Sequence, residues 1–122
     1  MSPKRLDRVA PPPVQAEWEV RFGTSEAAKG WDDLCAQIPE NTRAAFEMMR
    51  SNPRPPADGT HYQLRDDLAT RDFQGRRLEQ WQVAVSGSGR IWYLPDDSKR
   101  TVWLVYASTA HPKQTEQRSG RR

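Results

Sequence analysis

The sequence predicts an α+β fold with an N-terminal strand, a helical hairpin and then a twisted, mostly antiparallel sheet of four to five strands. Three observations predict it. Residues 18–22 alternate apolar and charged side chains, as in a strand with one buried face. Residues 27–49 carry apolar side chains at helical spacing on both sides of a proline. After residue 75, apolar runs alternate with short turns rich in Gly, Ser, Pro and Asp, as in β-hairpins.

Length and composition predict one domain, over residues 17–115. Residues 1–16, which include Pro11–Pro13, form a basic, proline-rich arm, and residues 116–122 form a basic tail; both are expected to be disordered. Only 35% of the residues are hydrophobic, and the mean hydropathy is −0.95. Five Trp, three Tyr and three Phe offset this, because aromatic side chains bury large areas. We therefore expect a compact, aromatic-rich core.

The helical hairpin is predicted from its ends and its apolar spacing. Gly23 ends the first strand, and Thr24 or Ser25 offers a capping hydroxyl. Pro39 breaks the first helix and opens the second, which Asn52 followed by proline closes. Apolar side chains recur at helical spacing in the first helix, at Ala27, Ala28, Trp31, Leu34, Cys35 and Ile38. Two short helices joined by a tight turn form an αα-hairpin.

The sheet follows a proline-rich loop over residues 53–59. Residues 61–64 form a short strand, and residues 78–85 form a longer one with Trp81, Val83 and Val85 on one face. Residues 90–94 and 101–107 complete the sheet, and the last strand is apolar enough to be buried on both faces. In residues 66–75 the apolar side chains follow neither helical nor strand spacing, so no element is predicted there.

Several classes of protein are excluded by what the sequence lacks. The single cysteine, Cys35, cannot form an intramolecular disulfide, and no apolar run is long enough for a signal peptide or a membrane span. We therefore expect a cytoplasmic protein with no membrane partner. The sequence has no Gly-rich phosphate loop, no Cys/His cluster at metal-ligand spacing and no GxSxG motif, so no metal or cofactor is expected.

The charge distribution is uneven. Residues 1–60 carry 8 basic and 9 acidic side chains, and residues 61–122 carry 11 and 7. A basic C-terminal half is compatible with a polyanionic partner, although a surplus this small can also serve solubility alone.

Cationic residues and a histidine lie at strand ends in this basic half. Arg76 and Arg77 open one predicted strand, Arg90 opens the next, and His111 and Lys113 follow the last. Gathered together, they would bind a phosphate chain, with the histidine exchanging protons near neutral pH. Taken singly, each is better explained as a solvated, ion-paired or terminal surface residue.

The predicted hairpin sets a geometric condition on this cluster. A tight turn at residues 95–98 places Arg90 opposite Val105, six residues before His111. A straight strand would hold the two about 20 Å apart. They share a site only if the chain bends back after Ala107.

The run Gly89-Arg90-Ile91-Trp92-Tyr93 resembles the C-terminal half of RelE/ParE-superfamily toxins, and most closely the actinobacterial RelE-like branch. Two further motifs of this branch occur in the same order. They are Glu79-Gln80-Trp81 and His111-Pro112-Lys113-x-Thr115-Glu116. The resemblance covers residues 18–116. It implies a RelE/ParE-like fold and a toxin that is neutralised by a cognate antitoxin protein within a toxin-antitoxin complex.

The resemblance also implies a chemistry. Many relatives cut mRNA in the ribosomal A site without metal, through attack of the ribose 2′-OH on the adjacent phosphate. By position, Arg90 matches the arginine that stabilises the phosphate, and His111 matches a residue acting as acid or base. Glu79 is a weaker candidate for the general base. Arg76, Arg77 and Lys113 would hold RNA phosphates.

Two departures from the family pattern keep alternatives open. Some relatives carry lysines on the strand where this chain has Gln80 and Gln82, and some carry a terminal tyrosine where it has Pro112. The leading hypothesis is a ribosome-dependent endoribonuclease. The alternatives are a ParE-like inhibitor of DNA gyrase and a non-catalytic RNA-binding module of the same fold.

Overall fold

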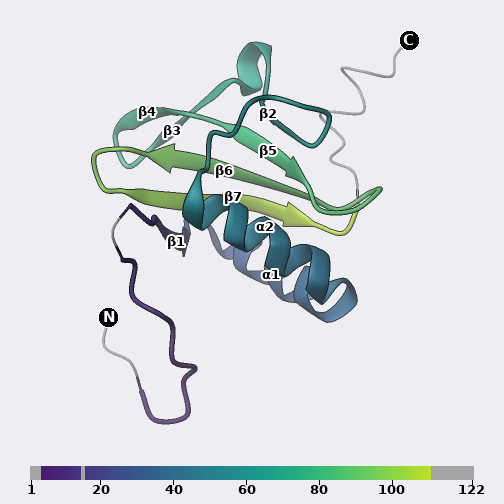
Figure 1. The fold of residues 1–122 in the computed structure, drawn as a ribbon. Helices are drawn as coiled ribbons and strands as arrows, with labels where there is room; N and C mark the ends of the chain where they lie inside the picture. The colour runs from purple at the N-terminus through teal and green to yellow at the C-terminus, as the bar shows by residue number, and fades with distance from the viewer. Residues whose placement is uncertain (1–3, 15, 111–122) are drawn as a thin grey trace.

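The computed structural model describes residues 4–14 and 16–110 (Figure 1). It confirms the predicted α+β class. In chain order the elements are β1 (Glu19–Phe22), α1 (Ser25–Gln37), α2 (Pro39–Ser51), β2 (His61–Gln63), the 3-10 helix η1 (Asp66–Leu68), β3 (Thr70–Phe73), β4 (Arg76–Glu79), β5 (Trp81–Ala84), β6 (Arg90–Asp96) and β7 (Thr101–Ser108). The main sheet has the order β1-β7-β6-β5-β2, with β1 parallel to β7 and the other pairs antiparallel.

The helical hairpin forms as the sequence predicts. The Thr24 hydroxyl accepts a hydrogen bond from the Ala27 N–H at 3.0 Å, which caps α1. Pro39 stands in the first turn of α2, where its missing N–H costs no hydrogen bond. Both helices pack on one face of the sheet (Figure 1).

Gly30 allows α1 to cross β7 at close range. A Cβ atom built on Gly30 would lie 1.8 Å from the Ala107 carbonyl oxygen. Only a residue without a side chain permits this approach. The crossing closes the main core, in which Leu34, Ile91 and Leu104 are fully or almost fully buried.

A second core lies on the opposite face of the sheet, under the hairpin of β3 and β4. Leu64, Trp92, Leu94 and Val105 are its buried members. The rings of Phe73 and Trp103 lie 5.1 Å apart and join the hairpin to the sheet.

The β3–β4 hairpin corrects the sequence prediction, which placed residues 78–85 in a single strand. The chain changes sheets at Gln80: β4 pairs with β3, and β5 pairs with β2 and β6. The Gln80 N–H donates to the Ala69 carbonyl, so the backbone stays hydrogen-bonded across the change. Alternation of side chains continues through such a junction, and the periodicity therefore did not reveal it.

The register of β6 and β7 also differs from the expected one. Arg90 lies opposite Ser108 and not opposite Val105. β6 continues through Asp96, the turn falls at residues 97–100, and an irregularity between Trp92 and Tyr93 shifts the pairing further.

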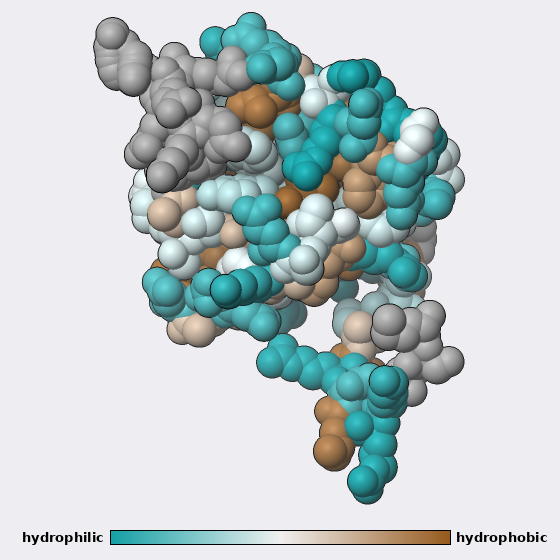
Figure 2. Space-filling model, turned by 180° about the vertical axis from the view of Figure 1, so that it is seen from behind, coloured by the Kyte–Doolittle hydropathy of each residue, from teal (hydrophilic) through white to brown (hydrophobic). Residues whose placement is uncertain are grey.

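Residues 4–14 of the arm contain no helix or strand, and Leu6 and Val9 are more than 90% exposed. The space-filling view shows this segment projecting from the body (Figure 2). Within the described ranges, neither helix is long and apolar enough to cross a membrane.

Candidate functional site

Four side chains form a continuous row across four strands, on the face opposite the helices. Tyr62, Gln82, Trp92 and Tyr106 lie directly opposite one another on β2, β5, β6 and β7. The Trp92 Nε1–H donates to Gln82 Oε1 at 2.8 Å, and Gln82 Nε2 donates to the Tyr62 hydroxyl at 2.6 Å. The rings of Trp92 and Tyr106 lie 5.1 Å apart. We call these four residues the cross-strand row.

Burial explains why the row is so tightly connected. Gln82 is 1% exposed, and a buried amide is stable only when its donor and acceptor are both satisfied. Trp92 satisfies the acceptor and Tyr62 accepts from the donor. The two tyrosines at the ends of the row are half-buried, so each keeps some surface toward solvent.

Arg90 stands one step beyond the row. It lies two residues from Trp92 on β6 and therefore on the same face. Its strand neighbours, Ala84 and Ser108, are both small. Its Nη1 donates to the carbonyl oxygens of Ser86 at 3.0 Å and Gly89 at 2.9 Å.

The charge of Arg90 has no acidic counterpart in the described part of the chain, because none of the ion pairs there includes it. Carbonyl dipoles hold the guanidinium in place but leave its net charge uncompensated. A half-buried cation beside aromatic rings suits a phosphate and a stacked base.

Arg76 is bound differently. Its guanidinium forms two hydrogen bonds with the carboxylate of Asp96, which is fully buried, and one with the Ser98 hydroxyl. The hydrogen bonds from Arg76, aided by those from Trp103 and Ser98, hold the pKa of Asp96 well below its usual range. Arg76 therefore anchors β4 to the β6–β7 turn.

Glu79 is also held by a cation. Its Oε1 accepts from Arg54 Nε at 2.9 Å and from Trp81 Nε1 at 3.0 Å. These hydrogen bonds, chiefly the one from Arg54, lower the pKa of Glu79 and make it a weaker base. Arg90 pairs with Ala84. Ala84 is five residues from Glu79, which corresponds to about 17 Å between their Cα atoms along an extended chain. The structure does not bring Glu79 to Arg90.

Arg77 is not gathered around Arg90 either. Arg77 lies on the β3–β4 hairpin, where its Nη1 donates to the Thr70 hydroxyl at 2.7 Å and its Nη2 lies 3.3 Å from Asp72 Oδ1. His111 and Lys113 lie outside the described residues.

Sequence reasoning missed Tyr62 and Tyr106 as members of a site. Both were expected in strands, but their proximity to Arg90 depends on register. The available signal was the spacing of Arg90 and Trp92, which places a cation and a ring on one face.

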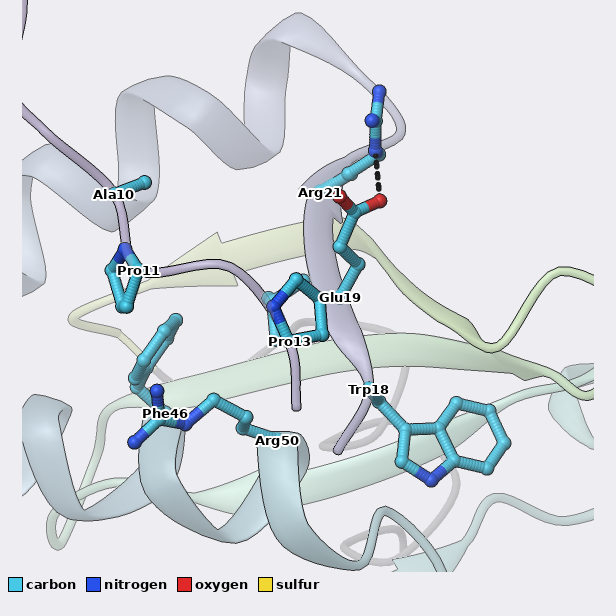
Figure 3. A pocket seen from close by; sticks show the side chains of 9 residues that line it. Ala10, Pro11, Pro13, Trp18, Glu19, Arg21, Phe46 and Arg50 are labelled. Carbon is cyan, nitrogen blue, oxygen red and sulfur yellow. Dashed lines mark hydrogen bonds and ion pairs between the residues drawn. The ribbon is translucent and has the colours of Figure 1, made fainter. Parts of the chain in front are cut away.

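A hollow of about 280 Å³ lies near the opposite edge of the sheet, between the arm, β1 and α2 (Figure 3). Trp18, Phe46 and two prolines of the arm contribute apolar walls. Its charged side chains are engaged: Arg21 pairs with Glu19 at 2.8 Å, and Arg50 lies over Phe46 and pairs with Glu47. The hollow therefore offers an apolar surface without a free catalytic group.

Potential metal ligands are not clustered in the part of the chain that the structure describes: it contains no group of three or more His, Cys, Asp or Glu side chains able to hold a metal ion.

Comparison with known proteins identifies the fold. No protein-family model and no curated protein matches the sequence. Among solved structures, a metal-bound toxin from Helicobacter pylori matches with a TM-score of 0.55 and 11% identity, covering 77% of this chain and 94% of that chain. This chain has the fold of that toxin. The RelBE2 toxin-antitoxin complex from Mycobacterium tuberculosis also matches, with a TM-score of 0.49 and 20% identity over 80% of this chain and 95% of that chain.

Proposed function

We propose that this chain is the toxin of a toxin-antitoxin pair and arrests translation by cutting mRNA on the ribosome without a metal ion. The observation that carries the proposal is Arg90, a cation without an acidic partner in the described residues, beside the cross-strand row. The sheet face thus combines a phosphate-binding group with aromatic rings for bases.

The fold supports this proposal, since the Helicobacter pylori protein that shares it is a toxin. The motif around Arg90 supports it from the sequence, because it resembles the segment of RelE/ParE-superfamily toxins that holds the phosphate-stabilising arginine. A toxin of this kind would be kept inactive by an antitoxin protein bound to its surface.

In the proposed reaction the ribose 2′-hydroxyl gives up its proton to solvent water as its oxygen attacks the adjacent phosphorus. A cyclic 2′,3′-phosphate forms as the bond to the 5′-oxygen breaks. Arg90 stabilises the charge that develops on the phosphate oxygens. His111 gives a proton to the leaving 5′-oxygen. His111 is three positions after Ser108, the strand partner of Arg90, which limits the distance between the Cα atoms of residues 108 and 111 to about 11 Å.

Inducible expression in bacteria without the antitoxin tests the proposal. Wild-type protein should arrest growth and produce mRNA fragments with free 5′-hydroxyl ends. Arg90→Ala should slow cleavage about 10²- to 10³-fold, as loss of one preorganised charge-stabilising group does elsewhere. Mapping RNA 5′ ends after induction measures both results.

The matched control is Arg43→Ala, which removes the same charge from an exposed site on α2. It should leave cleavage unchanged. Urea unfolding should show that Arg90→Ala costs less than about 1 kcal/mol, because it removes a half-buried side chain bonded only to carbonyls. Cleavage at the wild-type rate by Arg90→Ala would disprove the assigned role.

One observation favours a second candidate, inhibition of DNA gyrase. Gln82, which lies on the strand where some relatives carry lysines, is neutral, buried and bonded within the cross-strand row. Linearised plasmid with intact RNA after induction would support this alternative. Unaffected growth without an antitoxin would indicate a non-catalytic RNA-binding module.

A further inference from the structure

The hydrogen bonds of the cross-strand row run in one direction. An indole N–H can only donate, so Trp92 requires the oxygen of the Gln82 amide. The NH₂ group of the same amide then faces Tyr62, whose hydroxyl oxygen must accept. The proton of the Tyr62 hydroxyl is thereby left to donate elsewhere.

This orientation is held by burial. Trp92 is 4% exposed and Gln82 is 1% exposed. Turning the amide over would leave the indole N–H facing another donor in a buried site, at the cost of an unsatisfied group. The tyrosine hydroxyl therefore cannot exchange its accepting role for a donating one toward Gln82.

The Tyr62 hydroxyl makes no other hydrogen bond with residues 4–14 and 16–110. Tyr62 belongs to β2, the edge strand of the sheet, and is half-buried. Its donor thus stands at the rim of the face that carries Arg90. Arg90 lies two strands away and two residues along the strand, which separates the two Cα atoms by about 12 Å.

We propose that Tyr62 donates a hydrogen bond to a phosphate oxygen of the bound RNA, next along the strand from the phosphate that Arg90 contacts, and that Trp92 and Gln82 hold its hydroxyl for this purpose. This inference rests on the proposed function. It makes Tyr62 a binding residue, with Gln82 acting through it as a positioning residue.

The test uses a short single-stranded RNA with a 2′-deoxyribose at the cleavage position, so that binding is measured without reaction. Tyr62→Phe removes only the hydroxyl. The Kd from fluorescence anisotropy at fixed salt should rise about tenfold, as expected for loss of a hydrogen bond to a charged group. The salt dependence of the Kd should stay the same, because no charge is removed.

Tyr93→Phe is the matched control. It removes a different tyrosine hydroxyl, a buried one that donates to the Pro53 carbonyl in the main core. It should reduce stability and leave the Kd unchanged. An unchanged Kd in Tyr62→Phe would overturn the proposal, even if the wild-type protein cuts mRNA in cells.

A double-mutant cycle separates positioning from simple packing. Gln82→Met keeps the volume of residue 82 and removes both of its hydrogen bonds. If the amide orients the hydroxyl, Tyr62→Phe should raise the Kd less in the Gln82→Met background than in the wild type. Equal effects in both backgrounds would overturn the positioning role of Gln82.

Discussion

The arginines at the two ends of the main sheet differ in what binds their guanidinium groups. At the β6–β7 turn, Arg54 and Arg76 are each bound by carboxylates. At the β5–β6 turn, Arg90 is bound by backbone carbonyls, with no ion pair in the described chain. The turns lie at opposite ends of the strands (Figure 1). An arginine paired with an acid has its charge neutralised, whereas one held by backbone dipoles keeps a net charge, which is what the proposed role of Arg90 requires.

We call the end of the sheet at the β6–β7 turn, where the arginines bind carboxylates, the paired end. Its ion pairs also hold the β3–β4 hairpin against the main sheet. Asp96 is fully buried and accepts hydrogen bonds from Arg76, Ser98 and Trp103. Asp96 is the buried partner of this ion pair, and Arg76 is partly exposed. Such a pair adds little net stability, but without Arg76 the buried carboxylate would lose its counter-charge. We infer that this end specifies where the hairpin docks.

Removing the buried acid should have the largest effect on stability. Asp96→Asn should lower the free energy of unfolding by about 2 kcal/mol, because a neutral amide at this buried position cannot accept all the hydrogen bonds that Arg76, Ser98 and Trp103 donate to the carboxylate. Urea unfolding followed by tryptophan fluorescence measures this. Asp97→Asn, in the exposed part of the same turn, is the control and should cost less than about 1 kcal/mol. Equal losses in the two variants would show that burial of Asp96 is unimportant.

Lowering the pH should reduce the free energy of unfolding by a smaller amount, through protonation of the same Asp96 carboxylate. The folded-state pKa of Asp96 lies below the value of about 3.9 for an unfolded aspartate. Its stabilising contribution is therefore complete above about pH 5 and is lost progressively as the pH falls toward the folded-state pKa. Unfolding free energies between pH 6 and pH 2 should fall more steeply in the wild type than in Asp96→Asn. Parallel curves would contradict the assignment.

Neutralising Glu79 should have the smallest effect. Glu79→Gln should cost about 1 kcal/mol or less, since the pair with Arg54 is partly exposed and Arg54 retains Asp97. Growth arrest should be unchanged, because Glu79 lies at the paired end of the sheet. Loss of RNA cleavage in a stably folded Glu79→Gln would place the reaction at that end instead and would undo the contrast between the ends.

Much of the fold was predictable because its signals are local. Alternation over residues 18–22, the hydroxyl of Thr24 and the helix break at Pro39 depend on neighbours in sequence. The β3–β4 hairpin was not predictable in the same way. Its strand β3 is largely polar and pairs with a segment whose alternation continues into β5.

The candidate site was predicted in part. Arg90 was identified from its place after a glycine turn, and the structure leaves it without an acidic partner among the described residues. Nothing in the sequence indicated that Arg76 forms an ion pair with Asp96 or that Glu79 forms one with Arg54. Those partners are 20 and 25 residues away along the chain and meet them only in the folded protein.

The sequence by itself determined the class of the fold, the order of its first elements and the cation at residue 90, because helix caps, helix breaks and side-chain alternation act between near neighbours. Only the tertiary structure decided the register that aligns Tyr62, Gln82, Trp92 and Tyr106, and which arginines are neutralised. Strand pairing and burial bring together residues distant in sequence, and the free energy that selects one register belongs to the packed sheet as a whole.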